Sequence, residues 1–472
     1  MILEVVTEKM LIMSIPVKKT LLVGIGGFGK TALHILKRTF FETFGFCDIP
    51  AIEYLVFDSE KDPNTLKYKN VFDSLDRQLG FGSDGKGNYV NMSCPRQILN
   101  DLFQGNANEE IKDSIRWFDK SLKDMGVQDL EDGASGIRAF GKLSFLLALL
   151  EGKQDIIQLI QNKLNKLNNL QKSDPIWDDT NNIFSLDTID SRIDIFFICS
   201  TAGGTGAGTF LDLAYFFKYL FQQKMIDTAG SAQEGDMVLY LFLPDIILDD
   251  PKLQKSFDPP SVFHKKKNNP QVLIKAGSYA ALSELERYQL SIGNSFRFDV
   301  GWQGTEFFVP DWDPFKDTIG KIAKYEFAGQ RPFDWVHLIG KRSTKGHTLI
   351  DAEDAIQMVS DKLFLMMVER EQGRLLSAFQ ANRPMFVIPE LLKVSHRSQL
   401  REYSRHYGGF GLSKISVREP IIHRWAAFYQ TEIYLTKLLK TAAVQNSQLA
   451  DISEDILNTF EWETHNFFNA FS

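Results

Sequence analysis

The sequence has few cysteines, no long apolar run and no strong excess of either charge. Its three cysteines, Cys47, Cys94 and Cys199, are widely spaced and form no metal-ligand pattern. This spacing argues against a disulfide framework or a zinc site and predicts reduced thiols in a cytoplasmic protein. No run of about 18 apolar residues occurs, so we predict no membrane partner. The net charge is −7 and the longest basic run is the three lysines at 265–267, which predicts no nucleic-acid partner.

Common catalytic signatures are missing as well. The eight histidines form no His-x-x-x-His or Glu-paired metal motif, and no Gly-x-Ser-x-Gly elbow occurs. We therefore predict no resident metal site and assign no catalytic residue from these patterns. The basic cluster at 396–405 is interpreted as a solvated helix face. What remains is a chain of 472 residues with 44% hydrophobic content, which is typical of a globular protein with two or three domains.

Hydrophobic patterning indicates alternating strands and helices. Residues 20–25 and 51–57 are apolar and β-prone, and the segment 31–44 between them has helical spacing. A strand–helix–strand order favours a parallel sheet. Apolar residues at three- and four-residue spacing predict a long helix over 351–379. Further strands are predicted at 193–200, 238–243 and 335–340, and further helices at 96–123, 155–170, 211–223, 277–290 and 421–444.

A glycine-rich segment, Gly24-Ile25-Gly26-Gly27-Phe28-Gly29-Lys30-Thr31, lies between the first predicted strand and helix. Glycine lets backbone amides approach a phosphate, and the helix N-terminus adds partial positive charge. The segment fits the P-loop pattern G-x-x-x-x-G-K-[ST], a dinucleotide-binding turn, or a purely structural tight turn. Lys30 is then either a phosphate contact or a solvated lysine at the start of a helix.

A second glycine-rich segment, Ala202-Gly203-Gly204-Thr205-Gly206-Ala207-Gly208-Thr209, follows the predicted strand 193–200 and precedes a helix. P-loop enzymes and dinucleotide-binding proteins need only one such loop. A P-loop enzyme also needs an acidic residue after a later strand, and Asp245 meets that requirement. A P-loop ATPase using Gly24–Thr31 therefore stays open at this point.

The second segment resembles the tubulin/FtsZ signature Gly-Gly-Gly-Thr-Gly-Ser/Thr-Gly. Ala202 stands in place of the first glycine and Ala207 in place of the small hydroxyl residue. The segments at 22–33, 57–60 and 133–141 resemble the family's first loop, its nucleotide-facing turn and its third, phosphate-facing loop. The stretches 200–215, 279–285 and 332–335 are more similar to the bacterial tubulin-like proteins than to FtsZ, and 407–412 resembles the strand that opens the family's second domain.

This resemblance implies an α/β fold with a parallel-sheet nucleotide-binding domain, a long central helix and a second α/β domain. It implies bound GTP or GDP with Mg²⁺, while ATP stays open because no guanine-contacting residue is identified. Asp58 and Asp245 are candidates for metal-water or ribose contacts, or else solvated carboxylates at strand ends. The nucleotide-binding residues carried over are Gly26, Gly27, Phe28, Gly29, Lys30, Thr31, Asp58, Ser135, Gly136, Arg138, Ala202, Gly203, Gly204, Thr205, Gly206, Ala207, Gly208 and Asp245.

The same resemblance suggests a domain plan. We expect an N-terminal arm or extra strand at 1–19, and a nucleotide-binding domain at 20–350 with insertions near 62–95 and 293–333. A central helix follows at 351–380. A second, activation-type domain occupies 381–472, and its apolar end is compatible with a chain that continues further.

Head-to-tail self-association into protofilaments is also implied by the resemblance. In tubulin and FtsZ an acidic residue after the central helix completes hydrolysis in the neighbouring subunit. The corresponding stretch here, 377–385, contains no carboxylate. GTPase activity is therefore left open, and a nucleotide-dependent switch or scaffold without filaments is the alternative.

Overall fold

The computed structural model describes most of the chain up to residue 368 and short pieces beyond it. The described residues are 15–69, 72–82, 87–106, 118–125, 130–131, 133–134, 136–150, 156–170, 184–186, 192–222, 234–250, 270–289, 331–342, 346–368, 390–392, 401–403, 407–408, 429 and 436. The chain divides into two compact units, Met1–Gly411 and Leu412–Ser472. Everything that follows concerns the first unit.

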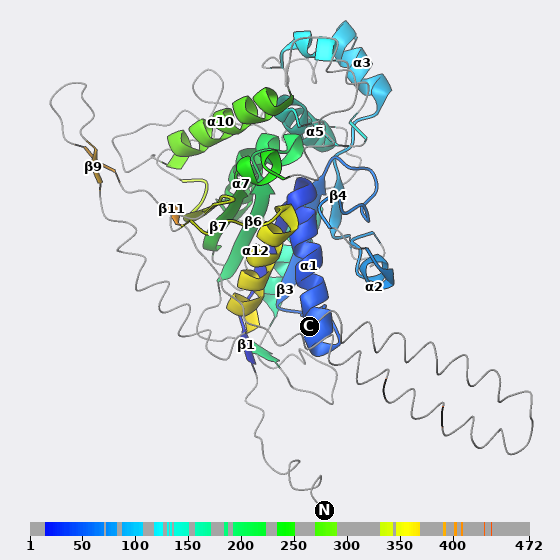
Figure 1. Cartoon of the computed structure of the whole chain (residues 1–472), viewed down its shortest axis with the longest axis vertical. Helices are drawn as coiled ribbons and strands as arrows, with labels where there is room; N and C mark the ends of the chain where they lie inside the picture. The colour runs from blue at the N-terminus through cyan, green and yellow to red at the C-terminus, as the bar shows by residue number, and fades with distance from the viewer. Residues whose placement is uncertain are drawn as a thin grey trace, which may run out of the picture. The chain divides into compact units, whose positions relative to one another are not determined.

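A seven-stranded parallel sheet forms the centre of this unit (Figure 1), in the order β11-β8-β7-β6-β2-β3-β4. Its central strands β2, β6 and β3 are buried along their whole length, as expected for a parallel sheet that is covered on both faces. The predicted α/β fold is confirmed. The strands are β2 (Thr20–Ile25), β3 (Ile52–Asp58), β4 (Tyr89–Asn91), β6 (Ile193–Ser200), β7 (Glu234–Phe242), β8 (Trp335–Ile339) and β11 (Tyr407–Gly408).

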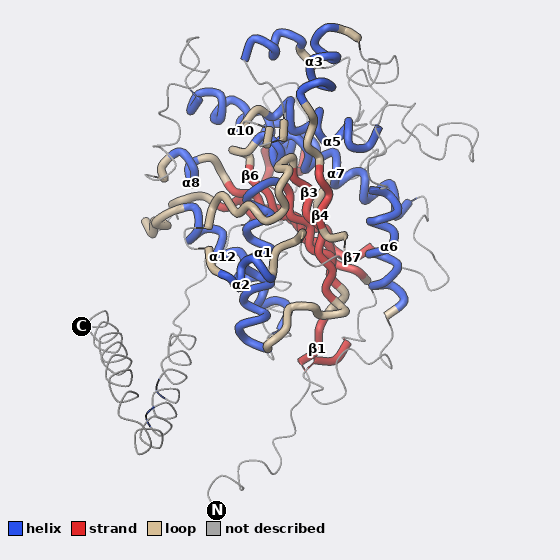
Figure 2. Tube along the Cα trace, turned by 90° about the vertical axis from the view of Figure 1, so that its right-hand side faces the viewer, coloured by secondary structure: helices blue, strands red, loops and turns tan. Residues whose placement is uncertain are grey.

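Helices cover both faces of the sheet, as Figure 2 shows with strands in red and helices in blue. On one face α1 (Gly26–Phe44) packs against α12 (Ala352–Val368), and the Ser360 hydroxyl donates to the Ala32 carbonyl at 2.9 Å. On the other face lie α5 (Arg138–Leu150), α6 (Ile156–Asn169), α7 (Gly204–Gln222) and α10 (Pro270–Gln289). Each set of helices closes its own apolar core against the sheet.

The chain leaves the neighbouring central strands β2 and β6 towards opposite faces of the sheet. The helix after β2, α1, covers one face, whereas the helix after the neighbouring β6, α7, covers the other. The strand order also reverses between β2 and β6, because β3 lies beyond β2 and β7 lies beyond β6. A crevice therefore opens at the carboxyl ends of these two strands, which is where ligands bind in open α/β sheets.

The glycine-rich segments differ from their prediction as loops, because α1 begins at Gly26 and α7 begins at Gly204. Packing explains the early helix starts. A Cβ atom at Gly29 would lie 2.3 Å from the Ile198 backbone oxygen, and one at Gly206 would lie 2.7 Å from that of Ser200. Since glycine has no Cβ, the first turn of each helix can lie directly against the strand β6.

The remaining elements modify several predictions. The segment 62–95, predicted as an insertion, supplies the edge strand β4 and the short helix α2 (Ser74–Gln78). Within the predicted helix at 96–123, the described residues form α3 (Arg96–Gln104) and the start of a 3-10 helix, Lys120–Met125. The strand β1 (Ile15–Val17) pairs in parallel with β5 (Phe184–Leu186), so the N-terminal region does supply an extra strand. The others are α8 (Asp245–Leu248) and the antiparallel pair β9 (Glu390–Leu392) and β10 (Arg401–Tyr403).

The predicted long helix is confirmed as α12 from Ala352 to Val368. Its continuation to 380, the insertion predicted near 293–333 and the helix at 421–444 lie outside the described residues, apart from residues 331–333, Tyr429 and Thr436. The short strand β11 pairs in parallel with β8 at an edge of the main sheet, and Tyr407–Gly408 belongs to the first compact unit. The second domain at 381–472 stays a prediction. No described helix has the length and apolarity that a bilayer crossing requires.

Candidate functional site

A pocket lies at the carboxyl ends of β2, β3 and β6, at the crevice that the sheet topology creates. It encloses about 660 Å³ of empty space including its open mouth. Its walls are the first turns of α1 and α7, the turn before α5, and the segment after β3. The lining residues are Ile25, Gly26, Gly27, Phe28, Lys30, Asp58, Thr65, Lys67, Tyr68, Gly133, Ala134, Gly136, Ser200, Gly203, Gly204, Thr205 and Gly206.

Two helices begin at this pocket, namely α1 and α7, and the turn that leads into α5 forms a third wall. The first four N–H groups of a helix have no partner within the helix, and the helix dipole adds partial positive charge there. The residue before α1, Ile25, offers no side-chain cap. Amides of the first turn of α1 can therefore serve a ligand, and the two helix ends together suit an anionic group such as a phosphate chain.

The two glycine-rich segments meet within the pocket. Gly26 has a φ of 68°, a left-handed conformation that side-chain-bearing residues rarely adopt. A Cβ atom at Gly26 would lie 3.2 Å from the backbone nitrogen of Gly206. By contrast, a Cβ atom at Gly203 would meet nothing within 4 Å. Gly203 therefore borders the open space of the pocket, whereas Gly26 brings the first turn of α1 against that of α7.

A buried ion pair lies in the pocket wall. The ammonium of Lys30 is 3.1 Å from Oδ2 of Asp58, and the two side chains are 1% and 5% exposed. The same ammonium lies 3.4 Å from the Asp62 carbonyl oxygen and 5.5 Å from the centroid of the Tyr89 ring. The alternatives that treated Lys30 and Asp58 as solvated surface residues are therefore wrong.

A second lysine–carboxylate pair lies in the wall that follows β3. The Lys67 ammonium is 2.5 Å from Oε2 of Glu60, and the Tyr89 hydroxyl donates to the Glu60 carbonyl. Next along the chain, the Tyr68 ring packs on Phe28 with ring centroids 4.1 Å apart. Sequence reasoning missed this wall, which contributes Thr65, Lys67 and Tyr68 to the pocket. Its residues carry no glycine pattern or strand periodicity that could have indicated a site.

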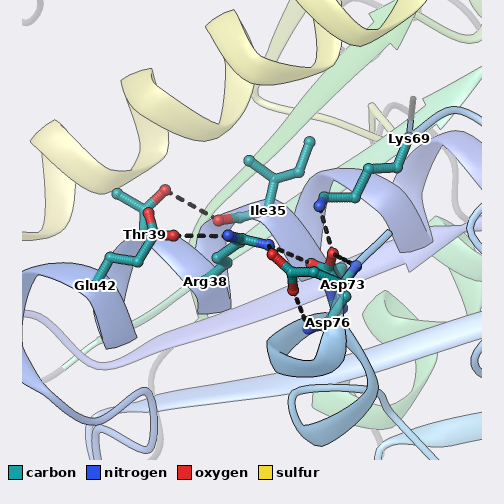
Figure 3. A network of polar contacts seen from close by, with 8 residues as sticks. Ile35, Arg38, Thr39, Glu42, Lys69, Asp73 and Asp76 are labelled. Atoms are coloured by element: carbon teal, nitrogen blue, oxygen red, sulfur yellow. Dashed lines mark hydrogen bonds and ion pairs between the residues drawn. The ribbon is translucent and has the colours of Figure 1, made fainter. Parts of the chain in front are cut away.

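A charge network anchors the end of this wall to α1 (Figure 3). Asp76, whose side chain is fully buried, accepts from Lys69 at 2.6 Å, from His34 at 2.9 Å and from Arg38 at 3.0 Å. Asp76 and Asp73 also form a reciprocal capping box at the start of α2. These contacts hold the pKa of Asp76 well below its usual range, against the opposing effect of burial.

The buried histidine of this network predicts a pH effect on stability. Burial lowers the pKa of His34 from 6.5 to about 4. The imidazole of His34 therefore takes up a proton near pH 6.5 in the unfolded chain but only near pH 4 in the folded protein. The stability of the folded protein that depends on neutral His34 is fully present above pH 6.5 and is lost as the pH falls towards 4. We expect a loss of up to about 3 kcal/mol in that interval.

Urea unfolding at pH 7 and pH 4.5 checks this prediction against the variant His34→Gln, whose side-chain amide can still donate to Asp76. The variant should lose less stability than the wild type between the two pH values. The pKa of the buried His337 is lowered to about 3, so both proteins share its contribution and the difference between them isolates His34. Equal losses in the two proteins would contradict the prediction.

Several sequence-predicted residues lie outside the pocket lining. Arg138 forms a bidentate ion pair with Glu284 and donates to the Ala207 carbonyl at 2.9 Å. Asp245 accepts from the Lys341 backbone amide at 2.8 Å, which ties the ends of β7 and β8 together. Thr31 donates to the Gly27 carbonyl within α1. Gly29, Ala202, Ala207 and Gly208 also fall outside the lining, and Ser135 lies outside the described residues.

The P-loop alternative does not fit this geometry. Helix α1 starts at Gly26, so the segment Gly24–Thr31 forms a strand end and a helical turn with no loop to wrap a phosphate. The Thr31 hydroxyl, which would hold a metal ion in a P-loop, is bonded within its own helix. Asp245, the residue proposed to complete such a site, is bonded to the Lys341 amide.

The described residues do not fit a Mg²⁺ ion held by the protein alone. Asp58, the carboxylate in the pocket, is paired with Lys30. Across the part of the chain that is described, no group of three histidine, cysteine or acidic side chains could hold a metal ion. A Mg²⁺ ion at this pocket would therefore be held by phosphate oxygens of a ligand together with water.

Comparison with known proteins gives one family and two loosely similar structures. A family model described as "Tubulin like" matches residues 21–428. The CetZ2 protofilament of Haloferax volcanii with bound GTPγS is 12% identical in sequence with a TM-score of 0.32. The match covers 77% of this chain and 63% of the CetZ2 chain. The GTPγS-form protofilament of Bacillus thuringiensis serovar israelensis TubZ is 9% identical with a TM-score of 0.29, and the match covers 76% of this chain and 58% of the TubZ chain. The match thus spans less than two thirds of either structure's chain, and no curated protein matches the sequence.

Proposed function

Since the chain belongs to the tubulin-like family, which its match over residues 21–428 establishes, we propose that it binds a guanine nucleotide, GTP or GDP, in the pocket at the ends of β2, β3 and β6. One observation carries this proposal: two glycine-rich helix N-termini, those of α1 and α7, meet at that pocket, and the turn before α5 forms a third wall. Helix N-termini bind phosphate through free amides and the helix dipole. The choice of guanine over adenine follows family membership.

The phosphate chain lies, in this proposal, against Gly26–Phe28, the turn before α5, and Gly203–Gly206. Mg²⁺ enters with the nucleotide, since Asp58 is occupied by Lys30. Arg138 and Asp245 act indirectly, by holding elements that border the pocket. Arg138 fixes the first turn of α7 through the Ala207 carbonyl, and Asp245 joins two strand ends beside the pocket.

Gly203→Leu tests the binding site. A side chain at Gly203 projects into open space, so the fold tolerates it while the pocket is filled. We expect the affinity for GTPγS, measured by titration calorimetry, to fall at least about 100-fold. Gly277→Leu is the matched control, because a Cβ atom at Gly277 in α10 also meets nothing within 4 Å and this glycine does not line the pocket. Unchanged binding in Gly203→Leu would refute the site, and ATPγS binding as tight as GTPγS would refute the base.

We further propose that the nucleotide-bound chain self-associates head to tail, as family membership suggests. Contacts of this kind are heterologous and extend into open filaments unless the rotation closes a ring. The three cysteines, buried and free of disulfides, suit assembly in a reducing cytoplasm. Light scattering and electron microscopy with GTPγS, GDP and no nucleotide test the proposal, and a monodisperse monomer in all three conditions would contradict it.

A nucleotide-dependent switch or scaffold is the second candidate. It is favoured by the stretch 377–385, which has no carboxylate to activate water in a neighbouring subunit and lies outside the described residues. Under this candidate GTP turnover stays negligible at every protein concentration. Turnover that rises steeply with protein concentration would exclude it and would show that one subunit completes the site of the next.

A further inference from the structure

The two lysine–carboxylate pairs in the pocket wall differ in how firmly they are held. The side chains of Lys30 and Asp58 are 1% and 5% exposed, and Lys30 also contacts the Asp62 carbonyl and the Tyr89 ring. The side chain of Lys67 is 47% exposed and that of Glu60 is 10% exposed. Lys30 is therefore a fixed part of the wall, whereas the half-exposed Lys67 can move its ammonium without opening the core.

The backbone that carries Lys67 is anchored on its C-terminal side. Tyr68 packs on Phe28, and Lys69 pairs with the buried Asp76. From this anchored position the Lys67 ammonium reaches the turn before α5, where it would lie 3.6 Å from a Cβ atom at Gly133. Both Lys67 and Gly133 line the pocket, so the ammonium extends from the wall after β3 to the opposite turn.

The electrostatic balance favours a phosphate over Glu60 as the partner of Lys67. The pair of Lys67 with Glu60 is held less firmly than a fully buried pair, because the ammonium of the 47% exposed Lys67 side chain is screened by solvent and loses side-chain freedom in the pair. A phosphate chain carries more charge than one carboxylate and forms charge-assisted hydrogen bonds with an ammonium. The same phosphate would be held by the helix ends that meet in the pocket. Lysine is suited to such an exchange, since its three donors sit on a flexible four-carbon stem.

We propose that Lys67 is a further nucleotide-binding residue, whose ammonium leaves Glu60 and binds the phosphate chain when nucleotide enters the pocket. Glu60 then acts as a competitor that holds this cation in the empty site. The inference rests on the proposed nucleotide-binding function. It predicts that the two partners of one ion pair have opposite effects on nucleotide affinity.

Two substitutions that break the same ion pair test the proposal, with GTPγS as the probe in titration calorimetry. Lys67→Met should weaken binding about 10- to 100-fold, because it removes a charge-assisted phosphate contact. Glu60→Gln should tighten binding by about threefold to tenfold, because it removes the carboxylate that competes for the cation and a negative charge from the wall. A purely structural ion pair would give the same direction of change in both variants, and that result would overturn the proposal.

Lys61→Met is the matched control. Lys61 lies in the same segment, its side chain is 66% exposed, and it pairs with Glu131 outside the pocket lining. We expect this variant to bind GTPγS as the wild type does, so an equal loss in Lys61→Met and Lys67→Met would mean that only general positive charge matters and would overturn the proposal. The double variant Glu60→Gln/Lys67→Met should lose most of the gain from Glu60→Gln, and a retained gain would contradict the exchange. If the wild type binds no GTPγS, the proposed function itself fails, whereas wild-type binding with no loss in Lys67→Met refutes only the role of Lys67.

Discussion

Replacing Lys30 with methionine should lower the free energy of unfolding by about 3–5 kcal/mol, which is the usual effect of removing one partner of a buried ion pair. Methionine fills nearly the same volume as the lysine stem, so packing changes little. The effect comes from Asp58, whose carboxylate would remain at 5% exposure without the cation that lies 3.1 Å away. Urea unfolding followed by circular dichroism measures the change.

The double variant Lys30→Met/Asp58→Asn separates charge from packing. Asparagine has the shape of aspartate without its charge, so most of the lost stability should return. Lys61→Met provides the comparison for an exposed lysine, where the expected loss is within about 1 kcal/mol. If Lys30→Met is as mild as Lys61→Met, the pair is solvated in solution and Lys30 is available to a ligand. If the double variant is no more stable than the single one, the loss arises from packing instead.

The role of Lys30 shows where sequence reasoning succeeded and where it failed. Its position at a strand–helix junction after several glycines marked it as part of a site, and it does line the pocket. Its partner could not be found from local pattern, because Asp58 ends a different strand that lies beside β2 only once the sheet has formed. The strands and helices themselves were predictable, since apolar runs and helical spacing are local properties of the chain.

Arg138 and Asp245 show the same limit at longer range. Each was selected because it follows a glycine loop or a strand in the order that the family uses. Arg138 instead meets Glu284, 146 residues later, and Asp245 meets the amide of Lys341, 96 residues later. The wall at 61–69 is a further case, because the contacts of Tyr68 with Phe28 and of Lys69 with Asp76 hold it in place.

The glycines of the second segment, 202–209, also have a packing role that the sequence did not indicate. The sequence favoured them as a phosphate-binding loop, yet only Gly203 faces open space while its neighbours bring α5 and α7 together. A Cβ atom at Gly204 would lie 2.6 Å from the Ala134 backbone oxygen, and one at Gly208 would lie 2.3 Å from that of Arg138. The pocket therefore depends on a close helix–helix contact that glycine alone permits.

The most sensitive point of that contact predicts the second large effect, for Gly141→Ala in α5. Its new Cβ atom would lie 2.0 Å from the Gly204 backbone oxygen, a distance at which one of the two helices must move. Since the partner is backbone and not a flexible side chain, we expect a loss of about 3 kcal/mol or more in the free energy of unfolding. We also expect weaker GTPγS binding, because Gly204 lines the pocket.

Gly277→Ala is the control, and it should change the free energy of unfolding in the opposite direction. Gly277 lies inside the helix α10, and a Cβ atom there meets nothing within 4 Å. Replacing an unobstructed helical glycine with alanine should stabilise the protein by about 0.5–1 kcal/mol, because alanine loses less backbone entropy on folding. Both variants are measured by urea unfolding, and binding by calorimetry at a temperature where each is folded. If Gly141→Ala were as stable as Gly277→Ala, α5 and α7 would not lie in contact in solution, and the turn before α5 could not form one wall of a shared phosphate site.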